Sequence, residues 1–186
     1  MSNSGKRHIQ RVADYAMDHG CSVCGEPFAK LLRRVFDYSD GNLIRKVKFS
    51  NRAPIGSVVG TLDCDGYLVT SINKRQYKVH HLVWLWHGND PVALLDHADG
   101  CVSNNRIENL RPASKSQNSA NSKIRSDNKS GAKGVSFDAR RGKWRAYITK
   151  DGVTKSLGYF TDFYDAESAY VLAALKKFGD FARIPK

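Results

Sequence analysis

The stretch that decides the fold runs Leu94-Leu95-Asp96-His97-Ala98-Asp99-Gly100, continues as Asn104-Asn105-Arg106-Ile107-Glu108-Asn109-Leu110, and ends in Ser114-Lys115-Ser116-Gln117-Asn118. Its first part predicts a short apolar strand that ends in an Asp-His pair and enters a polar, glycine-containing loop. A second short strand should follow the loop. Ser114 with Gln117 three residues later matches a capping box, so a helix is expected to begin there.

Three side chains of this stretch could form a catalytic site. Asp96 and Asn118 are hard oxygen donors, an incomplete ligand set that favours Mg²⁺, or Mn²⁺, with water and a substrate phosphate in the remaining positions. His97 is an imidazole, a natural base for activating water near physiological pH. Metal and base together indicate phosphodiester hydrolysis. An Asp-His pair alone is more often structural, so the weight lies on the whole ordered set of polar residues.

Composition indicates the kind of partner. The 186 residues include 30 Lys plus Arg against 18 Asp plus Glu, a formal charge of +12. Such an excess favours a polyanion, with double-stranded DNA as the first candidate, over a small-molecule substrate. No apolar run approaches the roughly 20 residues that span a bilayer, so no membrane partner is expected. The first residues lack the apolar core of a signal peptide, which predicts a cytoplasmic location, the bacterial host cytoplasm if a phage encodes the chain.

The N-terminal segment, residues 1–33, has no assigned role. Ile9 to Met17 has helical spacing, and Cys21-Ser-Val-Cys24 forms a Cys-x-x-Cys pair. A structural zinc site needs four ligands, and this is the sequence's single pair of that spacing. Zinc at Cys21 and Cys24 therefore stands beside the alternative of two free or buried thiols in a turn.

Residues 34–93 predict a β-rich lead-in to the deciding stretch. Ser39-Asp40-Gly41-Asn42 is a hairpin turn between apolar residues. Residues 67–72 predict a strand, 73–75 a turn, and 77–80 another strand. Residues 81–88 predict a short buried helix with Gly88 at its end.

His80, Asp96-His97-x-Asp-Gly, Asn104-Asn105-Arg106-x-x-Asn109-Leu110-Arg111 and Gln117-Asn118-x-x-Asn121 together resemble the HNH homing endonucleases of phage type. The resemblance implies a ββα-metal (His-Me finger) core. It implies that His97 is the general base, that Asp96 and Asn118 are the metal ligands, and that Asn109 braces the loop and helps to place the base. His80 precedes the core, and a structural or phosphate-side role is favoured for it.

The C-terminal part predicts a separate unit. Residues 122–133 are polar, small and basic, and read as a linker. Strands are expected at 135–137, 143–149 and 153–160, followed by a helix that Asp165 caps and that runs through Lys177, with Gly179 beyond its end. In the middle strand Trp144, Ala146 and Ile148 alternate with polar residues, so one face should pack on the helix and the other should be exposed.

The exposed face is expected to bind DNA. Residues 123–155 hold ten Lys or Arg and three Asp, a net charge of +7. A basic three-stranded face can enter a major groove, whereas the alternative is an ordinary half-solvated sheet. The predicted contacts are Arg140, Arg141, Lys143, Arg145, Tyr147, Thr149 and Lys155.

Gly134-Val135, Gly142-Lys143-Trp144-x-Ala146-x-Ile148, Leu157-Gly158-x-Phe160 and Ala169-Tyr170 resemble the DNA-binding domain of plant ethylene-response factors. The resemblance implies that the sheet contacts DNA and that Lys143 matches a contacting lysine. Ser136 and Thr149 stand where the plant domains tend to have arginines, so the plant target sequence does not carry over.

The expected fold class is α+β, with a nuclease domain at 34–121, a basic linker at 122–133 and the sheet-and-helix domain at 134–186. The expected function is a metal-dependent homing endonuclease. Its alternatives are a non-cleaving DNA-binding regulator with a decayed core and an RNA-directed nuclease. A monomer would nick one strand, and a homodimer could cut both. Deleting residues 123–186 is expected to weaken DNA binding and leave weak, unselective nicking.

Overall fold

The structure is a computed structural model that describes residues 28–48, 50–72 and 75–184. The chain divides between Pro112 and Ala113 into two compact units, which are treated separately below. The possible zinc ligands Cys21 and Cys24, the helix expected at 9–17 and most of the turn at 73–75 lie outside the described residues. Both units combine helices with small sheets, so the mixed α and β class is confirmed.

The first unit begins with α2 (Phe28–Val35) and the hairpin of β1 (Phe36–Ser39) and β2 (Asn42–Arg45). Asp40 and Gly41 form its two-residue turn with φ of 51° and 85°, the left-handed pair that such hairpins require. The turn expected from the sequence is therefore confirmed. A β-carbon on Gly41 would lie 2.9 Å from the backbone nitrogen of Arg106, so the turn packs closely on the loop that follows the Asp-His pair.

A three-stranded antiparallel sheet follows, with the order β3 (Thr61–Leu62), β4 (Leu68–Ile72) and β5 (Arg75–Lys78). The helix α3 (Val79–Trp86) then begins directly at the end of β5. The sequence led us to expect a strand through His80, and this was wrong. Most residues of α3 are buried, so no polar face marked where the helix starts.

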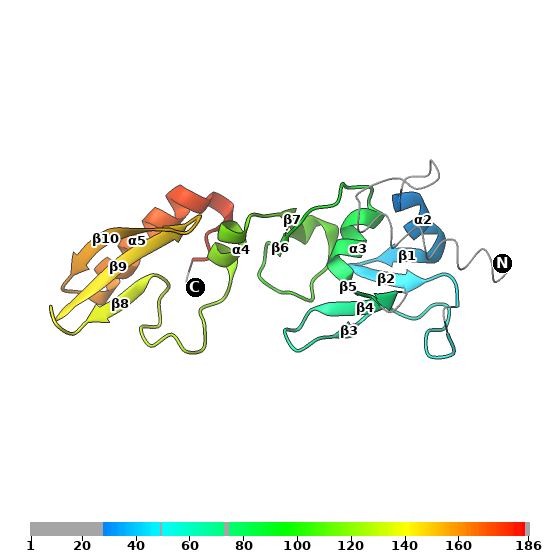
Figure 1. Cartoon of the computed structure of the whole chain (residues 1–186), viewed down its shortest axis with the longest axis horizontal. Coiled ribbons are helices and arrows are strands. Elements are labelled where there is room, and N and C mark those ends of the chain that lie inside the picture. The colour runs from blue at the N-terminus through cyan, green and yellow to red at the C-terminus, as the bar shows by residue number, and fades with distance from the viewer. Residues whose placement is uncertain (1–27, 49, 73–74, 185–186) are drawn as a thin grey trace. The chain divides into compact units, whose positions relative to one another are not determined.

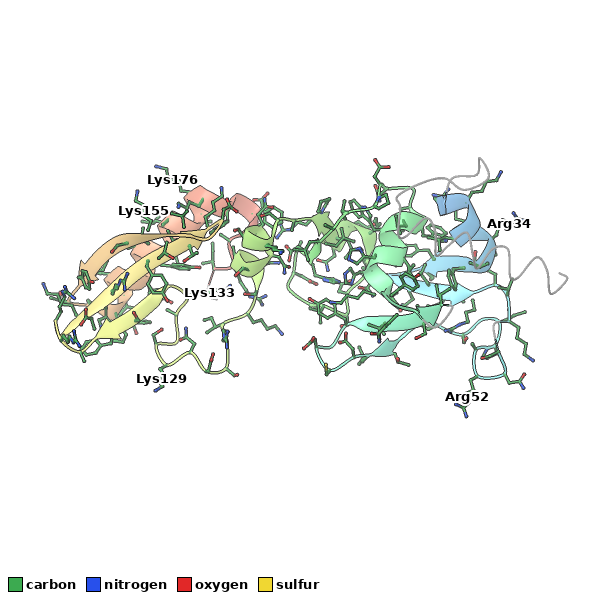
Figure 2. All side chains as sticks on the ribbon, viewed as in Figure 1. Arg34, Arg52, Lys129, Lys133, Lys155 and Lys176 are labelled. Atoms are coloured by element: carbon green, nitrogen blue, oxygen red, sulfur yellow. The ribbon has the colours of Figure 1, made fainter. Side chains whose placement is uncertain are left out.

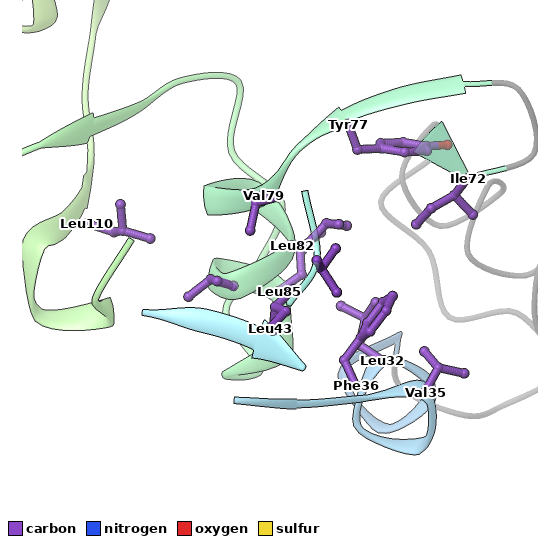
Figure 3. Close-up of a cluster of buried hydrophobic side chains, with 12 residues drawn as sticks. Leu32, Val35, Phe36, Leu43, Ile72, Tyr77, Val79, Leu82, Leu85 and Leu110 are labelled. Carbon is purple, nitrogen blue, oxygen red and sulfur yellow. The ribbon is translucent and has the colours of Figure 1, made fainter. Parts of the chain in front are cut away.

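The unit closes with β6 (Leu95–His97), a 3₁₀ turn at Ile107–Asn109 and β7 (Leu110–Pro112), and β6 pairs antiparallel with β7. Figure 3 shows the main apolar cluster, in which Leu110 joins side chains from α2, β1, β2 and α3. The β6–β7 hairpin is thereby attached to the core. The cluster comprises Leu32, Val35, Phe36, Leu43, Val59, Ile72, Tyr77, Val79, Leu82, Val83, Leu85 and Leu110.

The second unit contains α4 (Lys115–Asn121) and a sheet in the order β10 (Val153–Phe160), β9 (Lys143–Lys150) and β8 (Val135–Asp138). The helix α5 (Phe163–Phe178) packs on one face of this sheet (Figure 1), and a 3₁₀ turn at Gly179–Phe181 follows it. Ala146 and Ile148 of β9 are buried toward α5, as the alternation predicted.

Two details of the second unit differ from expectation. Asp162 rather than Asp165 caps α5, because its carboxylate accepts bonds from the backbone nitrogens of Tyr164 and Asp165 at 2.7 and 3.3 Å. Residues 122–133 contain no helix or strand, yet they are anchored. Asn128 donates to the carbonyl of Ala132 at 3.1 Å, and Ala132 is 1% exposed. No helix among the described residues has the length and apolarity to cross a membrane.

Candidate active site

The β6–β7 hairpin presents the Asp-His pair. In its register Asp96 lies opposite Arg111 and His97 lies opposite Leu110. Leu95, Asp96 and His97 are all buried, with Asp96 4% and His97 3% exposed. Consecutive side chains of a strand normally point to opposite faces. Asp96 and His97 stand where β6 ends and the loop begins, and this restriction is relaxed there.

The His97 imidazole is oriented by a buried amide. Its Nε2 lies 3.0 Å from Oδ1 of Asn105, which is itself 1% exposed. With the amide oxygen toward the ring, Nε2 carries the proton and donates it, and Nδ1 keeps the lone pair that a general base needs. The Nδ2 of Asn105 is buried without a hydrogen-bond partner.

Two aromatic rings lie around His97. His80 of α3 packs edge-on at 4.9 Å between ring centroids, and Tyr67 lies at 6.0 Å. Burial lowers the pKa of His80 to about 2, and the neighbouring His81, His97 and Lys78 add to the effect. His80 is therefore neutral at physiological pH, and its Nδ1 is buried without a partner.

Asp96 is paired with a cation across the hairpin. Nε and Nη2 of Arg111 lie 2.9 and 2.8 Å from Oδ2 of Asp96, and the Asp96 side chain is 5% exposed. The pairing follows from the register, because opposite residues of an antiparallel pair share a face. Arg111 thus compensates the negative charge of this buried carboxylate.

Asn109 braces the loop between β6 and β7. Its Nδ2 donates to Oδ1 of Asp99 at 3.0 Å and to the carbonyl of Asn104 at 2.8 Å, and its Oδ1 accepts from the backbone nitrogen of Asp99 at 3.0 Å. The backbone of Ala98 donates to the Asn109 carbonyl at 2.9 Å. These bonds fix the loop that carries Asn105, and any catalytic role of Asn109 stays a prediction.

The first hairpin supports the same loop from its other side. The Tyr38 hydroxyl accepts from the backbone nitrogen of Ile107 at 3.1 Å, and Arg106 pairs with Asp40 at 2.6 Å. The β-rich lead-in therefore holds the loop that orients His97.

Asn118, the second predicted metal ligand, lies on α4 of the second unit and is half-buried. The predicted capping box is confirmed, because Ser114 Oγ accepts from the Gln117 nitrogen at 3.2 Å and the Gln117 side chain accepts from the Ser114 nitrogen at 2.7 Å. The pairing of Asn118 with Asp96 stays a prediction. Among the described residues, no group of three or more His, Cys, Asp or Glu could hold a metal ion.

Most of the predicted DNA contacts gather on the outer face of the second unit's sheet. Arg145 lies between Ser136 of β8 and Tyr159 of β10 in the register, and its guanidinium lies 5.4 Å from the Tyr147 ring. Arg141 stacks on Tyr159 at 4.8 Å. Lys143, Thr149 and Arg140 are exposed beside them.

Lys155 is the exception in this set. The register places it opposite the buried Ile148, on the side of the sheet that faces α5, away from the outer face. The two-residue turn at Asp151-Gly152 pairs Val153 with Lys150, and the regular register from there places Lys155 opposite Ile148. Counting along both strands from the predicted turn would have revealed it.

Sequence reasoning missed three contributors to the site. Asn105 stands in the quoted motif without an assigned role, and its contact with His97 spans the loop. Arg111 was quoted in the motif without a role, although an arginine opposite an aspartate in a hairpin would have been a signal once the register was known. Tyr67 lay outside the motif, and nothing in the sequence linked it to His97.

The sequence that carries this site matches known proteins. The profile of the HNH endonuclease family matches residues 77–120. Protein 3.8 of Escherichia phage T7 is 38% identical over 85 residues, which cover 42% of this chain and 69% of that protein. No solved structure shows significant similarity to the chain.

Proposed function

Because the chain belongs to the family of protein 3.8 of Escherichia phage T7 and carries an HNH endonuclease domain at residues 77–120, we propose that it is a metal-dependent DNA endonuclease of homing type, which cuts duplex DNA at a recognised site. The observation that carries the proposal is the buried Asp96–His97 pair at the end of β6, with the His97 ring oriented by Asn105.

In this proposal His97 accepts the proton of the attacking water at Nδ1, while Asn105 holds Nε2–H. The neutral ring of His80 packs edge-on against the His97 ring. Asn109 keeps the loop in place. A buried, oriented base of this kind contributes about 10²–10⁴-fold to the rate of a hydrolytic step.

Asp96 and Asn118 would hold the divalent ion. One carboxylate and one amide fit Mg²⁺, which keeps several waters and takes substrate phosphate oxygens as further ligands. When bound, the ion would supply stabilisation of the charge that develops on the phosphate oxygens. Arg111 of β7 compensates the negative charge of the Asp96 carboxylate and holds this carboxylate in position.

The outer sheet face of the second unit would bind the duplex, in the manner of the ethylene-response-factor domain that it resembles. Arg141, Lys143 and Arg145 supply positive charge there, and Tyr147 and Tyr159 supply aromatic surface. This division gives the first unit the general base and the second unit the selection of the site.

A cleavage assay on phage genomic DNA tests the proposal. Wild type should nick DNA in Mg²⁺ or Mn²⁺ and be inactive in EDTA. His97→Ala should lower the single-turnover rate by at least about 100-fold, because the base is lost, while binding to DNA in EDTA is unchanged. Protein that binds duplex DNA but never nicks it in either metal would overturn the enzyme reading.

One observation favours the alternative of a DNA-binding protein that does not cut. Asp96 and His97 are both less than 5% exposed, and Asp96 is already paired with Arg111. A buried pair of this kind can also be purely structural. The same assay decides, because a non-cleaving regulator would show selective DNA binding that is identical with and without Mg²⁺.

A further inference from the structure

We infer that Lys133 and Arg183 are positioning residues for Asn118, because they hold the carboxyl end of α4 within the second unit. The inference rests on the proposed function, in which Asn118 is a metal ligand.

Lys133 reaches the end of α4 from the following segment. Its Nζ donates to the carbonyls of Ala120 at 2.8 Å and Ser119 at 3.3 Å, and it lies 3.4 Å from Ser122 Oγ. The last carbonyls of a helix have no partner within the helix and carry its negative dipole end, so a cation there is favourable. Figure 2 labels Lys133 and also Lys129, an exposed residue earlier in the same segment.

Arg183 reaches the same helix end from the C-terminal side. Its Nη1 donates to the carbonyl of Asn121 at 3.3 Å, and its backbone nitrogen donates to that of Ala120 at 3.4 Å. The last three carbonyls of α4 are thus bound from outside the helix. The two cations come from segments on either side of the sheet domain in sequence.

The remainder of α4 is also built into this unit. Ser116 Oγ donates to Asp151 in the β9–β10 turn at 2.8 Å and accepts from the Asp151 nitrogen at 2.8 Å. Ala120 is buried in the cluster of Ile148, Ala174 and Phe178. Ser116 and Ala120 are four residues apart and share one helix face.

Asn118 stands midway between Ser116 and Ala120 and therefore projects from the opposite side of α4. A helix of seven residues is too short to be stable alone in water, so its orientation depends on the contacts of its anchored face and ends. The direction of the Asn118 side chain is accordingly set by the second unit.

Lys133→Met in the full chain tests the inference, with Lys129→Met as the matched control. Both substitutions remove one positive charge from the same segment. Lys129 is exposed, however, and its side chain makes no hydrogen bond to α4 in the described part of the chain. Three quantities are compared. The first is Mn²⁺ affinity without DNA, measured from the paramagnetic resonance of the free ion. The second is the hydrogen-exchange rate of the α4 amides, and the third is the affinity for duplex DNA in EDTA.

Lys133→Met should bind Mn²⁺ roughly 10-fold more weakly than the control, in line with the loss of a supporting residue around a metal ligand. Its α4 amides should exchange faster, its DNA affinity in EDTA should equal the control's, and Lys133→Arg should restore Mn²⁺ binding. Equal Mn²⁺ affinity in Lys133→Met and Lys129→Met overturns the inference while leaving the nuclease proposal intact.

If Lys133→Met loses DNA binding in EDTA, its second unit has not folded and Arg183→Met decides instead. The expectation is the same weakening of Mn²⁺ binding, and an unchanged affinity overturns the inference. Wild type that neither binds Mn²⁺ nor nicks DNA defeats the proposed function itself, which separates the two failures.

Discussion

In the proposed mechanism, one amide prepares the His97 ring to act as a base. Asn105 is almost fully buried, and its Oδ1 faces Nε2 of His97 at 3.0 Å. A ring whose Nε2 proton is held in this way cannot turn without leaving a buried acceptor unpaired. The contact therefore selects both the tautomer and the orientation in which Nδ1 can act.

Asn105→Ala is expected to slow single-turnover nicking by roughly 10- to 100-fold, because the His97 ring loses its fixed orientation. Stability should fall by about 1–3 kcal/mol, since the substitution leaves the buried Nε2–H of His97 without its acceptor, and the loss is limited because the removed amide nitrogen already lacks a partner. Nicking rates and urea unfolding of the same samples check both statements.

Asn104→Ala is the control for Asn105→Ala. Asn104 is half-buried in the same loop, and its Nδ2 donates to Asp99 at 2.7 Å without contacting His97. It should retain most of the nicking rate. An equal loss of rate in both variants would mean that loop integrity, and not the orientation of His97, limits the reaction.

The sequence singled out the residues of the Asp-His pair but not their partners. Asp96 and His97 stand out because an Asp-His pair after an apolar strand is a local pattern. Their contacts with Arg111 and Asn105 depend on how two strands separated by a 12-residue loop align. That alignment comes from Asn109 and the Tyr38 hairpin, whose bonds span many residues.

At the scale of single elements, the sequence predicted turns and helix caps where their signals lie within a few consecutive residues. Asp40-Gly41 and Asp151-Gly152 form two-residue turns with positive φ, and Ser114 caps α4. The choice of Asp162 over Asp165 as the α5 cap could not be made from spacing alone, because both precede a helical pattern. An acidic residue in the first turn, such as Asp165, is also favourable there.

Gly134 directly precedes β8 and lies in close contact with residues of β9 and α5. Its φ is +62°, and a β-carbon there would overlap the carbonyl oxygen of Tyr147 and the ring of Tyr170. Gly134→Ala should destabilise the second unit by about 2–4 kcal/mol, through left-handed strain and overpacking together. Urea unfolding monitors stability, and DNA affinity in EDTA should fall with it.

Gly131→Ala separates the two contributions. Gly131 has a φ of +79°, but a β-carbon there would meet nothing within 4 Å. It should cost about 1–2 kcal/mol from backbone strain alone. If Gly131→Ala is as destabilising as Gly134→Ala, the close approach of β8 to Tyr147 and Tyr170 carries no energetic weight.

At the scale of the whole molecule, the two units differ in how they respond to acid. All six histidines precede residue 98, so the second unit has none. In the first unit His80 has a pKa of about 2, lowered chiefly by burial, and burial also lowers the pKa of His81. Below pH 6.5, and for His80 down to about pH 2, the unfolded chain therefore binds protons at these rings more readily than the folded chain does.

Stability of the first unit must therefore fall as the pH drops below 6.5, and it is unaffected by these rings above that value. For His80 alone the loss at pH 5 is about 2 kcal/mol relative to pH 7.5. We expect calorimetry of the full chain to show two unfolding transitions. From pH 7.5 to pH 5 the midpoint temperature of one should fall by roughly 5–10 °C, and that of the other should fall much less.

His80→Gln assigns the acid-sensitive transition. The variant removes the ring that resists protonation, so the transition of the first unit should become less dependent on pH even if its temperature at pH 7.5 is lower. Retention of the full pH dependence in His80→Gln would show that other groups cause it. The transition of residues 113–186 is identified because it coincides with the loss of DNA binding in EDTA. If the midpoint temperature of that transition falls more in acid than that of the first unit, the assignment to the first unit is wrong.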